Sequence, residues 1–197
     1  MTKNGEQPAI DRKAFILIDY TIDFVATEGK LTVGDPGQRI EPAIHERMKV
    51  VAAEQGMILV VNDLHESGET NHPEHRLFPP HNLAGSQGRR LYGRLEDLVE
   101  SMEKSSPNQV IRLDKRRYSA FCGTPLELIL RQEGIQKIEL AGVCTDICVL
   151  HTAIEAYQKG FQVTIDEEMV ASFNEEAHRV ALDHFESVLG FQVKRRG

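Results

Sequence analysis

Short apolar runs rich in β-branched residues recur along the chain, and longer segments of mixed polarity separate them. Continuous apolar runs of this length are typical of strands that are buried on both faces, as in a parallel sheet. The runs predict six strands, at Ala14–Ile18, Met57–Val61, Val110–Leu113, Ile138–Val143, Gln162–Ile165 and Phe191–Lys194.

The segments between these runs have the periodicity of amphipathic helices. They predict helices over Arg39–Gln55, Leu91–Glu103, Pro125–Glu133, Asp146–Lys159 and Glu175–Leu189. The third begins with Thr124-Pro125-Leu126-Glu127, which combines an N-cap residue, a proline at the first helical position and a capping-box glutamate. Helices that alternate with strands predict a three-layer α/β fold, in which helices cover both faces of a mostly parallel six-stranded sheet.

One long stretch, Asp63–Arg90, shows neither the apolar runs of a buried strand nor the periodicity of an amphipathic helix. A segment of this length without regular structure, inside a compact domain, is usually either functional or disordered. Histidine, proline, phenylalanine and acidic residues are interleaved in it, whereas disordered segments are commonly low in complexity. We therefore expect an ordered, functional loop.

Composition narrows the class of protein. A chain of 197 residues suits a single domain, and the first twelve residues lack the apolar core of a signal peptide. We expect a flexible tail over residues 1–12 and one domain over residues 13–197. The net charge of −7 disfavours nucleic acid and anionic membranes as partners, and no apolar stretch approaches the ~20 residues of a membrane span. Three cysteines, an odd number, fit a reducing cytoplasm better than a disulfide framework.

Chemically active side chains follow several of the predicted strands closely. In open α/β sheets, ligands bind beyond the carboxyl ends of the strands, so these residues are candidates for one shared site. They are Asp19, Asp63, His65, Lys115, Cys144 and Cys148.

Cys148 is the candidate nucleophile. The helix after Val143 is predicted to begin at Thr145 or Asp146, both good N-cap residues, which places Cys148 in its first turn. There the helix dipole favours thiolate over thiol, and free backbone N–H groups, including that of Cys144, can hold an oxyanion. Taken alone, however, the segment favours a small core residue, since buried free cysteines are common.

Asp19 and Lys115 gain significance only together with Cys148. Taken singly, Asp19 is explained as an acid that caps a turn, and Lys115 as one more exposed base in a basic loop. As a set, the three supply a thiol nucleophile, a carboxylate base and a cation that keeps the carboxylate ionised. Cys122 follows no strand and is interpreted as structural.

The loop DLHESGETNHPEHRLFPPH, which begins at Asp63, contains a candidate metal site. Asp63 and His65 are two residues apart, so both point the same way in an extended chain. Glu74, His75 and His81 follow, and mixed carboxylate and imidazole ligands suit zinc, manganese or iron(II) better than calcium or magnesium. Four of the eight histidines lie between His65 and His81, although a solvated polar loop remains the alternative.

Four segments together resemble the nicotinamidases of the isochorismatase-like cysteine hydrolases. They are IDYTIDF, DLHESGETNHPEHRLFPPHN, DKRRYSAFCGT and GVCTDICVLHTA, in the order of the family. The resemblance extends from Lys13 to Val193 and implies the isochorismatase-like hydrolase fold. Position 144 is often alanine or leucine in relatives, which implies that Cys144 contributes its backbone rather than its thiol.

The resemblance implies catalytic roles for the motif residues. Asp19 is implied to be the base, Lys115 the active-site amine and Cys148 the nucleophile. The backbone N–H groups of Cys144 and Cys148 are implied to hold the oxyanion, and the Val143–Cys144 peptide is implied to be cis.

The resemblance also implies how metal and substrate are held. The implied metal ligands are Asp63, His65, Glu74 and His81, with His72 or His75 as alternatives at the third position. The aromatic residues implied to wall the substrate are Phe24, Phe78 and Tyr118.

The implied activity is hydrolysis of nicotinamide to nicotinate and ammonia through a cysteine thioester, a step of NAD salvage, with pyrazinamide as a further substrate. One divalent ion, zinc in preference to manganese or iron, is expected to bind and orient the pyridine ring. A homo-oligomer in the cytoplasm is expected. Two alternatives remain: a related cysteine amidohydrolase of carbamoyl or ureido compounds, and a non-catalytic module that senses metal or redox state.

Overall fold

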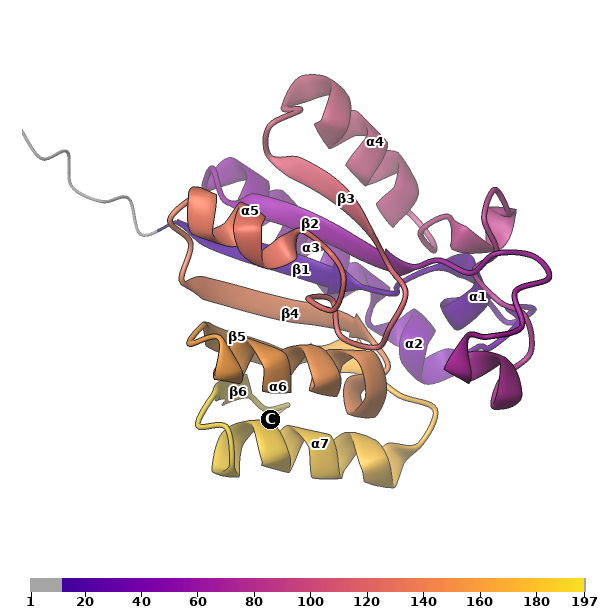
Figure 1. Cartoon of the computed structure of the whole chain (residues 1–197). Helices are drawn as coiled ribbons and strands as arrows, with labels where there is room; N and C mark the ends of the chain where they lie inside the picture. Colours follow the sequence, from indigo (N-terminus) through magenta and orange to yellow (C-terminus); the bar gives the residue numbers. More distant parts are fainter. Residues whose placement is uncertain (1–11, 197) are drawn as a thin grey trace, which may run out of the picture.

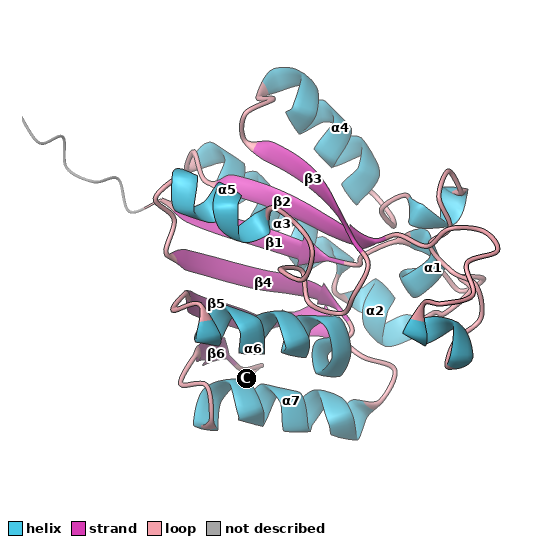
Figure 2. Ribbon diagram, in the orientation of Figure 1, coloured by secondary structure: helices cyan, strands magenta, loops and turns pink. Residues whose placement is uncertain are grey.

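The computed structural model of the chain describes residues 12–196, so residues 1–11 of the predicted tail lie outside the described residues. Six strands form one sheet in the order β3-β2-β1-β4-β5-β6 (Figures 1 and 2). Their bounds are β1 Lys13–Ile18, β2 Met57–Asp63, β3 Val110–Lys115, β4 Lys137–Val143, β5 Gln162–Ala171 and β6 Gln192–Lys194. The six predicted strands are confirmed, and every pairing among them is parallel.

Helices cover both faces of the sheet, which gives the three predicted layers. α3 and α4 pack on one face, with the short α1 and α2 beside them, and α5, α6 and α7 pack on the other (Figure 1). The helices are α1 Ile22–Val25, α2 Asp35–Arg39, α3 Glu41–Ala53, α4 Leu95–Ser105, α5 Leu126–Gln132, α6 Leu150–Gln158 and α7 Glu175–Ser187. The short turns are η1 Pro73–Arg76, η2 Gln87–Arg89 and the π-helical η3 Thr145–Val149.

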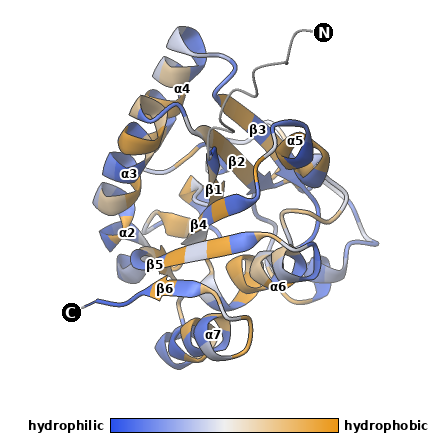
Figure 3. Cartoon of the chain, turned by 90° about the vertical axis from the view of Figure 1, so that its left-hand side faces the viewer, coloured by the Kyte–Doolittle hydropathy of each residue, from blue (hydrophilic) through white to orange (hydrophobic). Residues whose placement is uncertain are grey.

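A hydrophobic core lies on each face of the sheet. This explains why apolar and polar residues do not alternate along the strands. In β1, the side chains of Ala14, Ile16 and Ile18 enter one core, and those of Phe15 and Leu17 enter the other. Each is at most 1% exposed, so both faces of the strand are buried. A central parallel strand therefore favours apolar residues at every position. Figure 3 shows hydrophobic residues concentrated along the strands.

The order of the strands reverses beside β1. The chain places β2 on one side of β1 and later returns to place β4 on the other side. In this kind of fold, such a reversal leaves a crevice at the carboxyl ends of the two strands, where ligands bind. Gly142 permits close packing there, since its φ is +117° and a Cβ atom would lie 2.0 Å from the carbonyl oxygen of Ile18. Only glycine fits that position.

β5 is longer than the sequence predicts. The predicted strand ends at Ile165, because an acidic stretch at residues 166–168 interrupts the apolar run. The strand continues to Ala171, and its last three residues are buried. Its register against β4 shifts between Leu140 and Gly142, an irregularity that no local sequence pattern reveals. The carboxyl end of β5 is therefore followed by Ser172 and the residues after it.

The start of α5 also differs from the prediction. The helix begins at Leu126 rather than Pro125, and the hydroxyl of Thr124 accepts the Leu126 N–H at 3.2 Å. The carboxylate of Glu127 accepts from the Lys159 ammonium instead of closing a capping box. The start of the helix is thus predicted to within one residue, but Glu127 pairs with Lys159 after α6 instead of capping its own helix.

The segment after β2 is irregular, as predicted, apart from η1 and η2. It is also longer than predicted, because α4 begins at Leu95 rather than Leu91. The backbone of Leu91 instead forms a bridge with Thr21, which ties the end of the loop to the segment after β1. Figure 1 shows the loop folded beyond the carboxyl ends of β1 and β2. None of the helices in residues 12–196 has the length and apolar sequence that a membrane span requires.

Candidate catalytic and metal-binding site

Asp19, Lys115 and Cys148 meet at the carboxyl edge of the sheet. Asp19 follows β1, Lys115 is the last residue of β3, and Cys148 lies in η3, directly after β4. The Nζ of Lys115 lies 2.7 Å from Oδ2 of Asp19 and 3.6 Å from Sγ of Cys148. All three side chains are buried. The structure therefore brings together the residues that the sequence predicts as a set.

Asp63 connects this group to the long loop. It faces Lys115 in the register of β2 and β3, and its Oδ1 lies 3.2 Å from the Lys115 Nζ. Its backbone N–H donates to Oδ1 of Asp19 at 2.7 Å. One buried ammonium group thus faces two buried carboxylates, and this pairing makes their removal from water tolerable.

Burial and neighbouring charges together set the pKa values of these groups. Burial raises the pKa of Asp19, and the Lys115 ammonium offsets only part of that effect. Burial lowers the pKa of Lys115, but its negative neighbours, led by Asp19, outweigh it and leave that pKa above its usual value. Burial also raises the pKa of Cys148, although the ammonium opposes it. Burial thus opposes the preference for thiolate that a helix start predicts, and a base is needed to remove the proton of Cys148.

The turn after β4 holds Cys148 in place. The residue before its first turn is Cys144, not Thr145 or Asp146, and that turn, η3, is π-helical before α6 begins. The carbonyl oxygen of Cys144 accepts the N–H groups of Ile147 and Val149, each at 3.1 Å. Cys148 keeps its predicted place in the first turn. The peptide bond that precedes Cys144 is cis, as the resemblance implies.

The two other cysteines lie in different surroundings. Cys144 is buried, and burial raises the pKa of its thiol to about 12, so this thiol stays protonated at neutral pH. Cys122 is exposed and therefore does not serve the core, contrary to its interpretation as structural. All three cysteines are free thiols, which excludes a disulfide between Cys144 and Cys148.

The four implied metal ligands lie close together. One ligand atom of each lies within 4.8 Å of those of the others, and the four residues are Asp63, His65, Glu74 and His81. The Nε2 of His65 lies 2.9 Å from Oδ2 of Asp63, and the Nε2 of His81 lies 3.5 Å from the same oxygen. The same two nitrogens lie 3.9 Å and 3.8 Å from Oε2 of Glu74. All four side chains are buried.

This group fits a divalent metal ion. Burial, together with the charge of Asp63, raises the pKa of Glu74 to about 6, so a cation here would relieve two crowded carboxylates. The Nδ1 of His81 lies 2.7 Å from the carbonyl oxygen of Pro79, and its Nε2 has no hydrogen-bond partner among the described residues. A carbonyl oxygen only accepts, so Nδ1 carries the proton and Nε2 keeps its lone pair for a metal. His72 and His75 are not in this group.

A small apolar cavity of ≈ 30 Å³ lies against Cys148. Its lining includes the three predicted aromatic residues, Phe24, Phe78 and Tyr118. It also includes three residues that the sequence analysis missed, Leu31, Ile147 and Phe173. Phe173 lies two residues after the true end of β5, so the strand-end argument would have found it had the strand been given its full length. Leu31 and Ile147 carry no comparable sequence signal.

Two polar residues after β1 fix the position of His81, and the sequence analysis singled out neither. Oδ2 of Asp23 accepts the backbone N–H of Asn82 at 2.8 Å, and the hydroxyl of Thr21 donates to Oδ1 of Asn82 at 2.9 Å. Asn82 follows His81 directly and has a φ of +44°. The second acid of the IDYTIDF segment thus holds the metal loop rather than a substrate.

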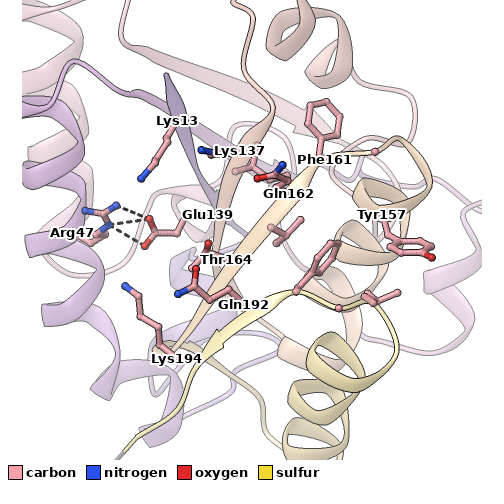
Figure 4. Close-up of a pocket in the computed structure, with 16 residues that line it drawn as sticks. Lys13, Arg47, Lys137, Glu139, Tyr157, Phe161, Gln162, Thr164, Gln192 and Lys194 are labelled. Atoms are coloured by element: carbon pink, nitrogen blue, oxygen red, sulfur yellow. Dashed lines mark hydrogen bonds and ion pairs between the residues drawn. The ribbon is translucent and has the colours of Figure 1, made fainter. Parts of the chain in front are cut away.

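A much larger cavity lies at the opposite, amino end of the strands (Figure 4). Its volume is ≈ 880 Å³, and its lining includes Lys13, Lys137 and the Arg47–Glu139 ion pair. No candidate catalytic residue or metal ligand lines it. The clustering of buried titratable groups, rather than cavity size, identifies the carboxyl edge as the reaction site.

The chain is similar in sequence and in structure to known proteins. A family model described as the isochorismatase domain matches residues 13–194. The chain is 52% identical over 182 residues to the isochorismatase family protein PncA of Bacillus subtilis, covering 92% of this chain and 98% of that protein. The crystal structure of nicotinamidase/pyrazinamidase PncA from Bacillus subtilis superposes with a TM-score of 0.90 at 48% identity, over 93% of this chain and 100% of the other. The pyrazinamidase of Pyrococcus horikoshii in complex with zinc superposes with a TM-score of 0.80 at 25% identity, over 94% and 99%.

Proposed function

The chain belongs to the isochorismatase family, and from that premise we propose that it is a nicotinamidase, which hydrolyses nicotinamide to nicotinate and ammonia. One observation carries the proposal. The buried ammonium group of Lys115 contacts the carboxylate of Asp19, the thiol of Cys148 and, on its other side, the carboxylate of Asp63. The thiol therefore has a base and a cation beside it, which are the groups that activate a thiol nucleophile.

Asp19 acts as the base in the proposed mechanism. It takes the proton of Cys148, and the thiolate attacks the carboxamide carbon of nicotinamide. Burial strengthens Asp19 as a base, since it raises the pKa of this carboxyl group. The ammonium group of Lys115 stabilises the thiolate as it forms, because it lies 3.6 Å from the sulfur.

The backbone N–H groups of Cys144 and Cys148 hold the oxyanion of the tetrahedral intermediate. Asp19 then returns its proton to the departing ammonia, and a thioester remains on Cys148. A water molecule, deprotonated by Asp19, releases nicotinate and restores the thiol.

One divalent ion would be held by Asp63, His65, Glu74 and His81. It would supply a Lewis acid that binds the pyridine nitrogen and so orients the ring. Zinc is proposed in preference to manganese or iron, since the Pyrococcus horikoshii relative was crystallised with zinc. The walls of the ring pocket are Phe24, Phe78 and Tyr118, whose side chains line the cavity against Cys148.

Pyrazinamide is proposed as a second substrate, because the Bacillus subtilis relative is named for both amides. The further predictions of one domain from residue 13, a cytoplasmic location, a role in NAD salvage and a homo-oligomer stay as proposals. The alternative of an amidohydrolase for carbamoyl or ureido compounds is not favoured, since the matches near 50% identity are to PncA proteins.

The test is release of ammonia from a panel of nicotinamide, pyrazinamide and a carbamoyl compound by metal-loaded protein. We expect turnover of the first two and formation of nicotinate from nicotinamide. Turnover of the carbamoyl compound alone would support the alternative enzyme, and no turnover at all would support a metal- or redox-sensing module. Cys122→Ala is the matched control for any cysteine variant, because Cys122 is exposed and outside the site.

A further inference from the structure

The cavity against Cys148 is too small for the proposed substrate. A cavity of ≈ 30 Å³ has room for a few water molecules at most. Pockets that bind drug-sized molecules have volumes of ~300–1,000 Å³. An aromatic amide such as nicotinamide therefore reaches the thiol only if a wall of the cavity moves.

Phe173 is the most exposed residue of the cavity lining. It is 55% exposed, whereas Phe24, on another wall, is 7% exposed. Phe173 also lines a second cavity, a groove of ≈ 470 Å³ between α2, β5 and α7. It is the only residue that the two linings share. The Phe173 side chain is thus a wall with the Cys148 cavity on one side and the groove on the other.

The ring of Phe173 has little packing to hold it in place. Phe24 belongs to one hydrophobic core, and Tyr118 packs against the other. Phe173 is part of neither core, and it contacts no other aromatic ring in residues 12–196. Exposed side chains change rotamer within picoseconds to nanoseconds. Rotation of Phe173 therefore breaks fewer contacts than movement of Phe24 or Tyr118.

The backbone beneath this ring is fixed at both ends. The connection from β5 to α7 is short and consists of residues 172–174. The Ser172 hydroxyl and the backbone of Phe173 interact with the buried thiol of Cys144. The side chain of Asn174 caps α7 by accepting the N–H of Ala177 at 3.0 Å. Motion at this position is therefore expected in the side chain rather than in the backbone.

We propose, on the premise that the chain acts on an aromatic amide, that Phe173 is the gate of the substrate pocket. Its ring turns into the groove between α2, β5 and α7 to admit the amide, and it turns back to close the pocket. In the closed position it completes the wall formed by Phe24, Phe78 and Tyr118 and keeps bulk water from the thiol. Phe173 thus limits the size of the ring that reaches Cys148.

The competing explanation is an opening through the loop that carries Phe78, another half-buried residue of the lining. Phe78 lies between the metal-group residues Glu74 and His81, and its N–H donates to the carbonyl oxygen of Glu74 at 2.9 Å. Movement of this loop would therefore disturb the metal group. That explanation predicts that truncation of Phe78, and not of Phe173, opens the way to Cys148.

The test is the rate at which the Cys148 thiol is alkylated, because this measurement needs no substrate turnover. Metal-loaded Cys122→Ala protein, which lacks the exposed thiol, is treated with iodoacetamide or with N-phenylmaleimide. Fragment-ion mass spectrometry then locates the label at position 148. A gate that is open in about a tenth of the molecules slows entry by that fraction, so Phe173→Ala in the same background should raise the rate ~10-fold. The increase should be larger for the maleimide, which carries a ring.

Tyr157→Ala is the matched control, since Tyr157 is an aromatic residue with a similar exposed fraction, 54%, and lines neither of the two cavities. It should leave both rates unchanged. Phe173→Leu should give an intermediate rate, so that a folding defect of one variant does not decide the outcome. An unchanged rate in both Phe173 variants, an equal increase in Tyr157→Ala, or an increase in Phe78→Ala alone would overturn the gate.

Kinetics with nicotinamide distinguish this proposal from the proposed function. Loss of one wall should weaken substrate binding more than the chemical step, so KM should rise in Phe173→Ala by a larger factor than kcat falls. Faster alkylation of Phe173→Ala in a protein without nicotinamide turnover would refute the proposed function and support the gate. Turnover together with unchanged alkylation would support the function and refute the gate.

Discussion

At the scale of single residues, the site depends on ion pairs between buried charged groups. Lys115 is 1% exposed, and its ammonium group lies within 3.2 Å of carboxylate oxygens of Asp19 and Asp63. A buried ion pair adds little net stability, but removal of one partner leaves an uncompensated charge. Lys115 therefore has a structural duty in addition to its proposed catalytic role.

Lys115→Ala should lower both activity and stability. Loss of the buried cation leaves Asp19 and Asp63 facing each other, which is expected to cost about 3–5 kcal/mol of unfolding free energy. Ammonia release should fall by ~100-fold or more, as for loss of acid–base assistance. Urea denaturation and an ammonia assay measure the two effects. Lys194→Ala is the control, because that lysine forms only an exposed pair with Asp166. Near-normal activity of Lys115→Ala would show that the buried cation has a structural role only.

Cys148→Ala should abolish turnover, whereas Cys144→Ala should retain most of it. The sulfur of Cys148 lies 3.6 Å from the ammonium group of Lys115, which stabilises its thiolate, and this geometry favours Cys148 as the nucleophile. Alanine at position 144 preserves the backbone N–H that is proposed to hold the oxyanion. Nicotinate formation is measured for the two variants, with Cys122→Ala as the control, and shows which cysteine is the nucleophile. Equal losses at positions 144 and 148 would indicate a paired-sulfur site instead of a single nucleophile.

At the scale of elements, the site is set by the contact between β1 and β4. Asp19 follows the first strand, and Cys148 follows the second in the π-helical turn η3. The two strands are neighbours, and Ile18 pairs with Gly142 in their register. The separation of base and nucleophile therefore depends on how closely two backbones pack at one glycine.

Gly142→Ala should destabilise the protein strongly and disable the site. A Cβ atom at this position would lie 2.0 Å from the Ile18 carbonyl oxygen, so the strands must separate. Gly134→Ala is the matched control, since its φ is +67° but nothing lies within 4 Å of the added atom. The control should lose about 1–2 kcal/mol from backbone strain alone, and Gly142→Ala clearly more. Urea denaturation compares them, and equal losses would show that the close approach of β1 and β4 has no energetic weight.

At the scale of the whole molecule, one edge of the sheet carries all the chemistry. The loop between β2 and α4 folds over the carboxyl ends of the strands, and Asp63 belongs both to the metal group and to the contacts of Lys115. The amino edge holds the larger cavity of Figure 4 but none of the reacting groups. The metal group and the Cys148 thiol thus lie close together, but we expect them to have different functions.

Metal removal should abolish substrate turnover without changing the reactivity of the Cys148 thiol. Chelated protein, or His81→Ala, should lose nicotinamide turnover, because the ring is no longer oriented, yet Cys148 should react with a small alkylating agent as fast as in loaded protein. Nicotinate formation and the rate of thiol alkylation are the two measurements. Metal-loaded Cys148→Ala should form no nicotinate. Appreciable turnover by that variant would make a metal-bound hydroxide the nucleophile and end the thioester mechanism.

The sequence by itself determined the strands, the fold class and most of the site residues. Strands such as β1 and β2 are buried on both faces, and this burial demands the continuous apolar runs that predicted them. Parallel strands place their carboxyl ends at one edge, so Asp19, Lys115 and Cys148 could be grouped without coordinates. The metal ligands and the aromatic wall came from the resemblance of whole motifs.

The tertiary structure alone decided what depends on packing between distant segments. It extended β5 to Ala171 and so placed Phe173 at the cavity, because burial beyond the acidic stretch arises from neighbouring strands. It placed Glu74, rather than His72 or His75, together with Asp63, His65 and His81, which spacing in a loop without periodicity cannot determine. It also set the surroundings of the nucleophile. A helix start favours thiolate, whereas burial raises the pKa of Cys148 and favours the thiol, and burial is a property of the fold rather than of the local sequence.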